Sequence, residues 1–123
     1  MAYFFAGGKK VNYQEYKQLL NRELAKKVQR EFDEFRKDIL TKNPQEIYDS
    51  ACQIVLKSDI AECFSKPNYS PQAAKALMKS PNLLQDIYEE WIERDSFHRE
   101  DLRGIIVDFK AYMVKTERIL SGK

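Results

Sequence analysis

The amino-acid sequence predicts an all-α fold, a compact bundle of about five helices with one long N-terminal helix. Apolar residues recur at spacings of three and four along most of the chain, which is the period of an amphipathic helix. No segment alternates apolar and polar residues as a half-buried strand would, and no Asn-Gly or Asp-Gly hairpin turn occurs. A capping side chain followed at once by proline, which is typical of a helix start, occurs at Asn43-Pro44, Ser70-Pro71 and Ser80-Pro81.

The first helix is predicted over residues 13 to 41. The Asn12 side chain can cap its first turn, and Glu15 stands three residues later, where it completes a capping box. The apolar stripe that follows stays on one face for about seven turns. Its members are Tyr16, Leu20, Leu24, Val28, Phe32, Phe35 and Ile39, with Leu19 and Leu40 beside them.

A second helix is predicted to start at Asn43-Pro44. Ser58 or Asp59 is expected to interrupt it, after which the apolar pattern resumes until Pro67. The face expected to point inward before that interruption consists of Ile47, Ala51, Ile54 and Val55.

Three further helices complete the predicted bundle. Ser70 and Ser80 are expected to cap two of them, each with proline as the first helical residue. The last helix is predicted to start near Ser96 or His98. Gly104 within it costs up to about 1 kcal/mol relative to alanine, so we expect a close contact with another helix at that position.

Length and composition fit one globular domain. The chain has 123 residues, 43% of them hydrophobic and 33% charged, which is typical of a folded protein. We expect a single helical domain over residues 12–121, preceded by an arm, residues 1–11, that is either flexible or docked. No apolar run reaches the roughly 18 residues that a membrane span requires, so we expect a cytoplasmic protein without a membrane partner.

Residues that carry catalytic or metal chemistry are few. His98 is the single histidine, and neither a Gly-x-Ser-x-Gly elbow nor a phosphate-binding Gly-rich loop is present. Zinc needs about four ligands, which His98, Cys52 and Cys63 do not supply. If the two cysteines share one helix they lie about 16 Å apart, too far for a disulfide. We therefore expect no enzyme activity, no catalytic residue, no metal and no cofactor.

Charge is unevenly distributed, although the net charge is only +2. Residues 1–42 hold ten Lys or Arg against six Asp or Glu, whereas residues 81–123 hold seven against nine. Acidic residues interleave with the basic ones on the first helix, so an ordinary exposed helix is one interpretation. The other is a stripe that follows a phosphate backbone, formed by Arg22, Lys26, Lys27, Arg30 and Lys37.

A second candidate binding segment lies at the N-terminus. Tyr3, Phe4 and Phe5 form an apolar cluster that is followed by Gly7-Gly8. Such a segment either docks on the bundle or provides a hydrophobic anchor for a partner. The sequence leaves both interpretations open.

Residues 73–91 resemble part of a known family. The positions that carry the resemblance are Leu77, the Lys79-Ser80-Pro81 turn, Leu84, Tyr88 and Trp91. The segment is similar to an uncharacterised bacterial family, domain-of-unknown-function family 3848, which is associated with gut Firmicutes and their mobile elements. The resemblance implies a bacterial, mobile-element context and brings no catalytic or cofactor residues with it.

These observations lead to three hypotheses about function. The first is a non-enzymatic binding protein that docks on a larger protein or nucleoprotein. The most specific version of this hypothesis is a mobile-element-encoded inhibitor of a host defence nuclease, similar to anti-CRISPR proteins. The second is a nucleic-acid-binding accessory protein that uses the basic face of the first helix. The third is a helical homodimer with a structural role, formed through the long apolar stripe.

Overall fold

The computed structural model describes residues 4–6, 9–94 and 99–120, with side chains at residues 10–94 and 101–119. Within these ranges the chain forms six helices and one two-stranded sheet, so the predicted all-α bundle is confirmed. The strands are β1 Phe4–Ala6 and β2 Lys9–Val11. The helices are α1 Tyr13–Leu40, α2 Pro44–Asp49, α3 Ala51–Cys63, α4 Pro71–Met78, α5 Leu83–Glu93 and α6 Arg99–Leu120.

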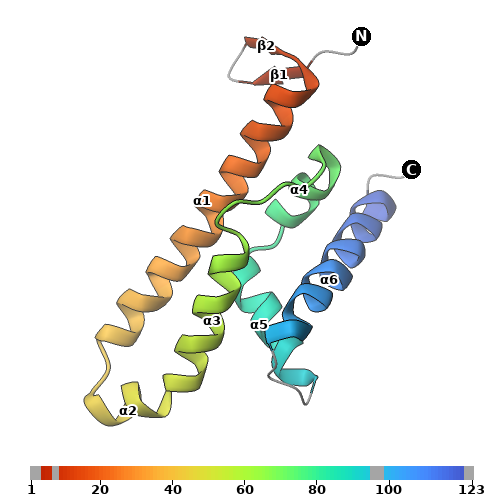
Figure 1. Cartoon of the computed structure of the whole chain (residues 1–123). Helices are drawn as coiled ribbons and strands as arrows, with labels where there is room; N and C mark the ends of the chain where they lie inside the picture. The colour runs from red at the N-terminus through yellow and green to blue at the C-terminus, as the bar shows by residue number, and fades with distance from the viewer. Residues whose placement is uncertain (1–3, 7–8, 95–98, 121–123) are drawn as a thin grey trace.

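The long helix α1 extends along the molecule from the hairpin at one end to α2 at the other (Figure 1). The chain reverses at α2, so that α3 lies beside the C-terminal half of α1, and α4 packs nearer its N-terminal half. Helix α5 contacts α1, α3 and α6, and α6 also contacts α4. One long N-terminal helix was predicted, and the 28 residues of α1 confirm it.

Helix starts follow the predicted caps at three places and differ at one. The cap predicted at Ser80 is wrong, because α5 begins at Leu83 and its cap is Asn82. The Ser80 hydroxyl is buried and donates instead to the carboxylate of Asp86 on α5. The predicted caps at Asn12, Asn43 and Ser70 are confirmed. Each side chain accepts a hydrogen bond from the backbone nitrogen three residues later.

The break in the second predicted helix lies at Ser50, and not at Ser58 or Asp59. The Ser50 hydroxyl donates at 2.8 Å to the carbonyl of Glu46, which also accepts from the Ser50 backbone nitrogen at 3.0 Å, and such a bond often bends a helix. Beyond the break, the inward positions predicted at Ala51 and Val55 are wrong, because Val55 is 59% exposed and Ala51 is also exposed. Ile60 and, just after the helix, Phe64 are buried, as the resumed apolar pattern predicted, and Leu56 is buried as well.

A short hairpin precedes α1, where the sequence predicted no strand. Strands β1 and β2 pair antiparallel, with Phe4 opposite Val11 and Ala6 opposite Lys9, and β1 contacts α1. The Gly-Gly pair between two short runs is itself a hairpin signal. Residues 4–6 and 9–11 of the predicted arm therefore form a hairpin whose first strand contacts α1. Residues 7 and 8 of the predicted arm lie outside the described residues.

One contiguous core joins five of the helices. Leu24 and Val28 bring α1 into it, as the apolar stripe predicted, whereas Leu40 at the end of that stripe is 72% exposed. Trp91 of α5 is fully buried within the same core. The other members are Leu56, Ile60, Phe64, Leu77, Leu83, Leu84, Ile87, Leu102, Ile105 and Ile106.

The close contact expected at Gly104 is wrong. Gly104 is exposed, and a Cβ added there would meet no atom within 4 Å. Nothing in the structure explains a glycine at this position. The predicted start of the last helix at Ser96 or His98 lies outside the described residues, and α6 is described from Arg99 onward.

Candidate macromolecular interface

Three of the predicted basic residues project from one exposed face of α1. Arg22, Lys26 and Arg30 are exposed and stand four residues apart, so neighbours lie about 6 Å apart along the helix axis. We call them the basic stripe. Lys26 has a long ion pair with Glu23, at 3.5 Å between exposed side chains, which contributes little in water. Arg22 and Arg30 have no ion pair with any residue that the structure describes.

Lys37 is exposed as well, but it does not continue the basic stripe. Glu34 occupies the position four residues after Arg30, and it is also exposed. Lys37 follows Glu34 by three residues and therefore lies beside an acidic side chain on the same face. The uninterrupted part of the predicted stripe thus ends at Arg30.

Lys27 was predicted on the outer side of the helix, and this is wrong. Its side chain is 8% exposed, and its Nζ lies 2.6 Å from Oε2 of Glu31, which is 7% exposed. Lys27 and Glu31 share the face of Leu24 and Val28, because residues three and four apart lie together on a helix. The pair belongs to the packing of α1 against α5 and is not available to a partner.

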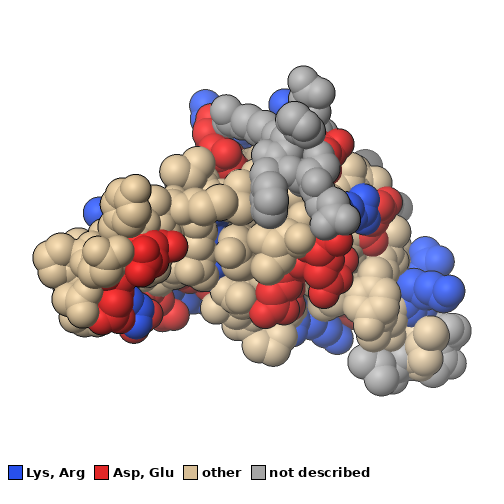
Figure 2. Space-filling view, turned by 90° about the horizontal axis from the view of Figure 1, so that it is seen from below, with Lys and Arg blue, Asp and Glu red and all other residues tan. Residues whose placement is uncertain are grey.

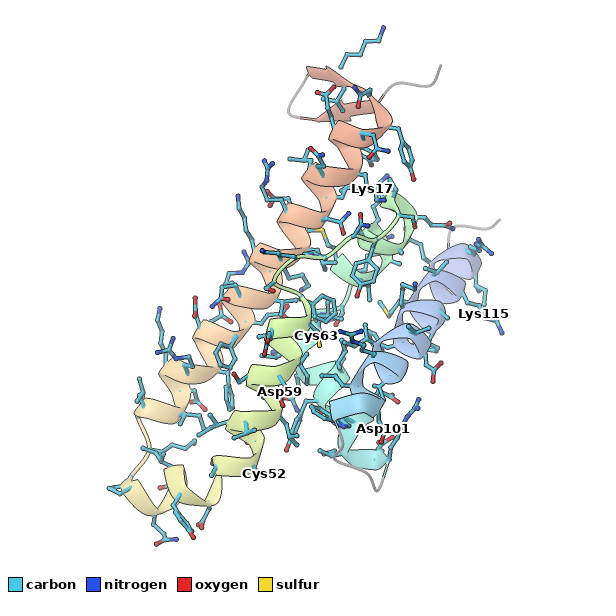
Figure 3. All side chains as sticks on the ribbon, viewed as in Figure 1. Lys17, Cys52, Asp59, Cys63, Asp101 and Lys115 are labelled. Atoms are coloured by element: carbon cyan, nitrogen blue, oxygen red, sulfur yellow. The ribbon has the colours of Figure 1, made fainter. Side chains whose placement is uncertain are left out.

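A polar cleft of about 340 Å³ lies beside the basic stripe, between α1 and the segment 65–68 that follows α3. We call it the basic cleft. Its cations are Lys17 and Arg22 of α1 and Lys66 of the segment, and the described residues that line it include no acid. Figure 3 shows Lys17 on the upper part of α1, on the side where α4 lies. The basic cleft is also lined by the amide side chains of Gln14, Gln18, Asn21 and Asn68.

Asn21 holds the two walls of the basic cleft together. Its Nδ2 donates to the carbonyl oxygens of Lys17 and Tyr69, each at 2.8 Å, and its Oδ1 accepts from the backbone nitrogen of Tyr69 at 2.7 Å. The side chain is only 5% exposed. Both hydrogen-bonding groups of the Tyr69 backbone are thus satisfied by α1, which fixes the chain just after Lys66.

Sequence reasoning found Arg22 but missed Lys17, Lys66 and Asn21. Lys17 and Lys66 come from segments that are distant in the sequence and meet only because α3 returns beside α1. A basic residue next to proline in a loop, as in Lys66-Pro67, was the available signal. Nothing local distinguishes Asn21 from the other polar residues of α1.

The opposite end of the molecule carries exposed apolar side chains. Leu40 is 72%, Tyr48 is 76% and Val55 is 59% exposed, and Cys52 between the last two is exposed as well. We call these four residues the tip patch, since they lie where α1, α2 and α3 meet (Figure 1). Figure 2 shows this end, at the left, as mostly uncharged surface with acidic and a few basic side chains.

The N-terminal aromatic cluster is described only in part. Phe4 and Phe5 belong to β1, where their Cα atoms pair with Val11 and Lys10. Their side chains and the whole of Tyr3 lie outside the described residues. A hydrophobic anchor at Tyr3, Phe4 and Phe5 therefore stays a prediction.

Lys57 of α3 is a buried cation that the sequence did not single out. It is 5% exposed, its Nζ donates to Oε1 of Gln85 at 2.6 Å, and the same nitrogen lies 4.1 Å from the centre of the Phe35 ring and 5.3 Å from that of Tyr88. Burial lowers the pKa of Lys57, and the charge of Glu89 partly opposes this shift. Lys57 does not line the basic cleft, and its contacts join α3 to α1 and α5.

Other kinds of site were sought among the same residues. No group of three or more His, Cys, Asp or Glu in the described ranges is placed to hold a metal, and His98 lies outside them. Cys52 and Cys63 are both free, as their separation on α3 predicted. None of the described helices is long and apolar enough to cross a membrane.

The fold and the cleft define a small helical-bundle protein with an exposed cationic groove. Comparison of the chain with protein-family models, with curated proteins and with solved structures found no match. The resemblance of residues 73–91 to domain-of-unknown-function family 3848 therefore remains a hypothesis.

Proposed function

We propose that the chain is a non-enzymatic protein that docks on a nucleoprotein and contacts its nucleic-acid backbone through α1. The observation that carries this proposal is the basic stripe next to the basic cleft. Arg22 belongs to both, and Lys17, Lys26, Arg30 and Lys66 extend the cationic surface on either side of it. Among the described residues Lys26 alone of these five has an ion pair, at 3.5 Å with the exposed Glu23, so this surface can release counterions by contacting phosphates.

The tip patch supports a protein component in the same target. Tyr48 and Leu40 are large apolar side chains that water covers over most of their surface, and aromatic residues are enriched at protein interfaces. The tip patch lies at the opposite end of α1 from the hairpin. A target that presents nucleic acid near one end of α1 and protein near the other would engage both surfaces.

The narrower form of the proposal is a mobile-element-encoded inhibitor of a host defence nuclease, similar to anti-CRISPR proteins. A guide-bearing nuclease is a nucleoprotein of the required kind, with nucleic acid held in a positively charged channel. A small protein without catalytic groups can inhibit it only by occupying a surface. The mobile-element context of this form rests on the hypothetical resemblance of residues 73–91.

The test compares two double charge reversals with equal change in net charge. Lys26→Glu/Arg30→Glu alters the basic stripe, whereas Arg103→Glu/Lys115→Glu alters exposed cations of α6. Binding to a fluorescent nucleic acid is measured by anisotropy for wild type and both variants. We expect the stripe variant to lose at least tenfold in affinity and the α6 variant to stay within about twofold. Equal losses would mean that only net charge matters.

A homodimer is the second candidate, and one observation favours it. The apolar stripe of α1 ends in Leu40, which the rest of the described chain leaves 72% exposed. A second copy could cover Leu40 together with Tyr48 and Val55. Light scattering on the purified protein distinguishes the two candidates, since a particle of 14.5 kDa is a monomer.

A further inference from the structure

We propose that the basic cleft binds one unpaired nucleotide of a single strand, with its phosphate among Lys17, Arg22 and Lys66. This inference rests on the proposed function and specifies the nucleic acid that the surface accepts. It begins from the charges. Three cations converge on one concave surface that has no acidic residue among the described residues lining it. Their mutual repulsion is relieved when an anion enters.

Two further clefts lined by described residues each include an acid. The cleft between the end of α3 and α6 contains Glu62 together with Lys66 and Arg103. The cleft between α5 and α6 contains Arg94 and Asp108, whose side chains form an ion pair at 2.9 Å. Of these three clefts, only the basic cleft has cations and no acid among the described residues that line it.

Contacts within the protein hold one wall of the basic cleft in place. The three hydrogen bonds of Asn21 attach the backbone of Tyr69 to α1, and Pro67 restricts the backbone between Lys66 and that attachment. A ligand therefore does not have to order the segment 65–68. Binding to a surface that is already in place avoids the entropy cost of ordering it.

The size and the remaining lining favour a nucleotide over a bare phosphate. A volume of about 340 Å³ falls within the range of small-ligand sites, and a lone phosphate would leave most of it unfilled. Apart from Asn21, Ala25 and Pro67, the rest of the wall consists of side chains that both donate and accept hydrogen bonds: Gln14, Gln18, Ser65 and Asn68. Base edges present donors and acceptors of the same kinds.

An unpaired base is required because of where base edges lie. In a duplex they face each other or the grooves, whereas a single strand can turn a base outward into a protein cavity. The basic stripe gives such a strand a path, since Arg30, Lys26 and Arg22 lead along α1 into the cleft. The stripe would contact phosphates of any nucleic acid, and the cleft would select the single strand.

The experiment measures anisotropy of a labelled 12-nucleotide single strand, as DNA and as RNA, and of the matching DNA duplex, all at 0.1 M salt. The cleft variant is Lys17→Ala/Lys66→Ala, and the control is Arg103→Ala/Lys115→Ala, with the same loss of charge. Each phosphate contact on a single strand contributes on the order of fivefold at this salt concentration. We expect the cleft variant to bind the single strand roughly 25-fold more weakly and the duplex less than threefold more weakly, with the control unchanged on both.

A second variant, Asn68→Ala, keeps the charge and should weaken single-strand binding alone. Thermal unfolding of each variant shows whether it folds. Equal losses on single strand and duplex, or no loss on the single strand, would overturn the cleft assignment. In that case continued binding by wild type, together with weaker binding by Lys26→Glu/Arg30→Glu, would leave the proposed function in place. Absence of wild-type binding to all three probes would overturn both.

Discussion

The carboxylate of Glu31 on α1 accepts a hydrogen bond from the backbone nitrogen of Leu84, at 2.9 Å, in the first turn of α5. The first backbone N–H groups of a helix have no partner within it, and the helix dipole favours a negative charge there. Glu31 of α1 supplies both the hydrogen-bond acceptor and the negative charge to α5. Its second oxygen lies 2.6 Å from Nζ of Lys27. The two buried charges thus position α5 against the long helix.

Removal of Glu31 should therefore be costly. Glu31→Ala leaves Lys27 buried without its partner and Leu84 without its acceptor, and we expect the free energy of unfolding to fall by about 3 kcal/mol or more. Urea denaturation followed by circular dichroism measures this. The control is Glu34→Ala, an exposed position on the same helix, which should change stability by less than about 0.5 kcal/mol. A similarly small effect of Glu31→Ala would refute the structural role of the pair.

The hydrogen bonds of Asn21 should stabilise the wall of the basic cleft. Asn21→Asp keeps the acceptor for the backbone nitrogen of Tyr69 but cannot donate to its carbonyl oxygen, and we expect a loss of about 1 to 3 kcal/mol in unfolding free energy. Gln18→Glu, on the same helix and lining the same cleft, introduces the same charge but leaves the hydrogen bonds between Asn21 and Tyr69 intact, and it should cost much less. Comparable losses for the two variants would point to charge rather than the hydrogen bonds.

Gly104 offers a stabilising substitution. A Cβ at this exposed helical position meets no atom within 4 Å, so Gly104→Ala gains helix propensity without a clash. We expect about 0.5 to 1 kcal/mol of added stability, visible as a higher midpoint in thermal unfolding. A lower midpoint would show that the glycine conformation or a partner at this face is needed by the fold.

Lys57 should make stability depend on pH in the alkaline range. Burial lowers the pKa of Lys57 in the folded chain below the usual 10.5. Between the pKa of the folded chain and 10.5 the unfolded chain binds more protons, so stability rises with pH. Above about pH 10 the tyrosines act in the opposite direction, because burial raises the pKa of Tyr69 and Tyr88 above 10.0 and the folded chain then keeps protons that the unfolded chain loses.

The variant Lys57→Met isolates the contribution of Lys57. It keeps an unbranched apolar side chain and removes the titrating group, while both tyrosines remain. The free energy of unfolding of wild type minus that of the variant should increase from pH 8 towards pH 10.5. A difference that stays constant over this range would show that Lys57 has the same affinity for its proton in both states.

The helices themselves could be predicted because their signals are local. Caps such as Asn12 and Asn43 act on residues three positions away, and the apolar period of α1 is visible in the sequence alone. Two nearby caps compete at Ser80 and Asn82, and only the burial of Ser80 against Asp86 decides between them. Local sequence patterns cannot predict that packing contact.

The interface could be predicted only in part for the same reason. Lys27 has the charge of its neighbours Lys26 and Arg30, and it is withdrawn from the surface because α5 packs over it and Glu31 pairs with it. Lys66 joins Lys17 only after α3 has returned along α1. The sequence identifies cations, and tertiary packing decides which of them meet.

The central claim is that the cationic surface of α1 binds a nucleic-acid backbone, and its salt dependence tests this most directly. The measurement is the affinity of wild type for the 12-nucleotide single strand between 50 and 200 mM salt. If Lys17, Arg22, Lys26, Arg30 and Lys66 all contact phosphates, the logarithm of the association constant should fall against the logarithm of salt with a slope of about −3.5. Binding that does not change with salt, or no binding at 50 mM, would contradict it.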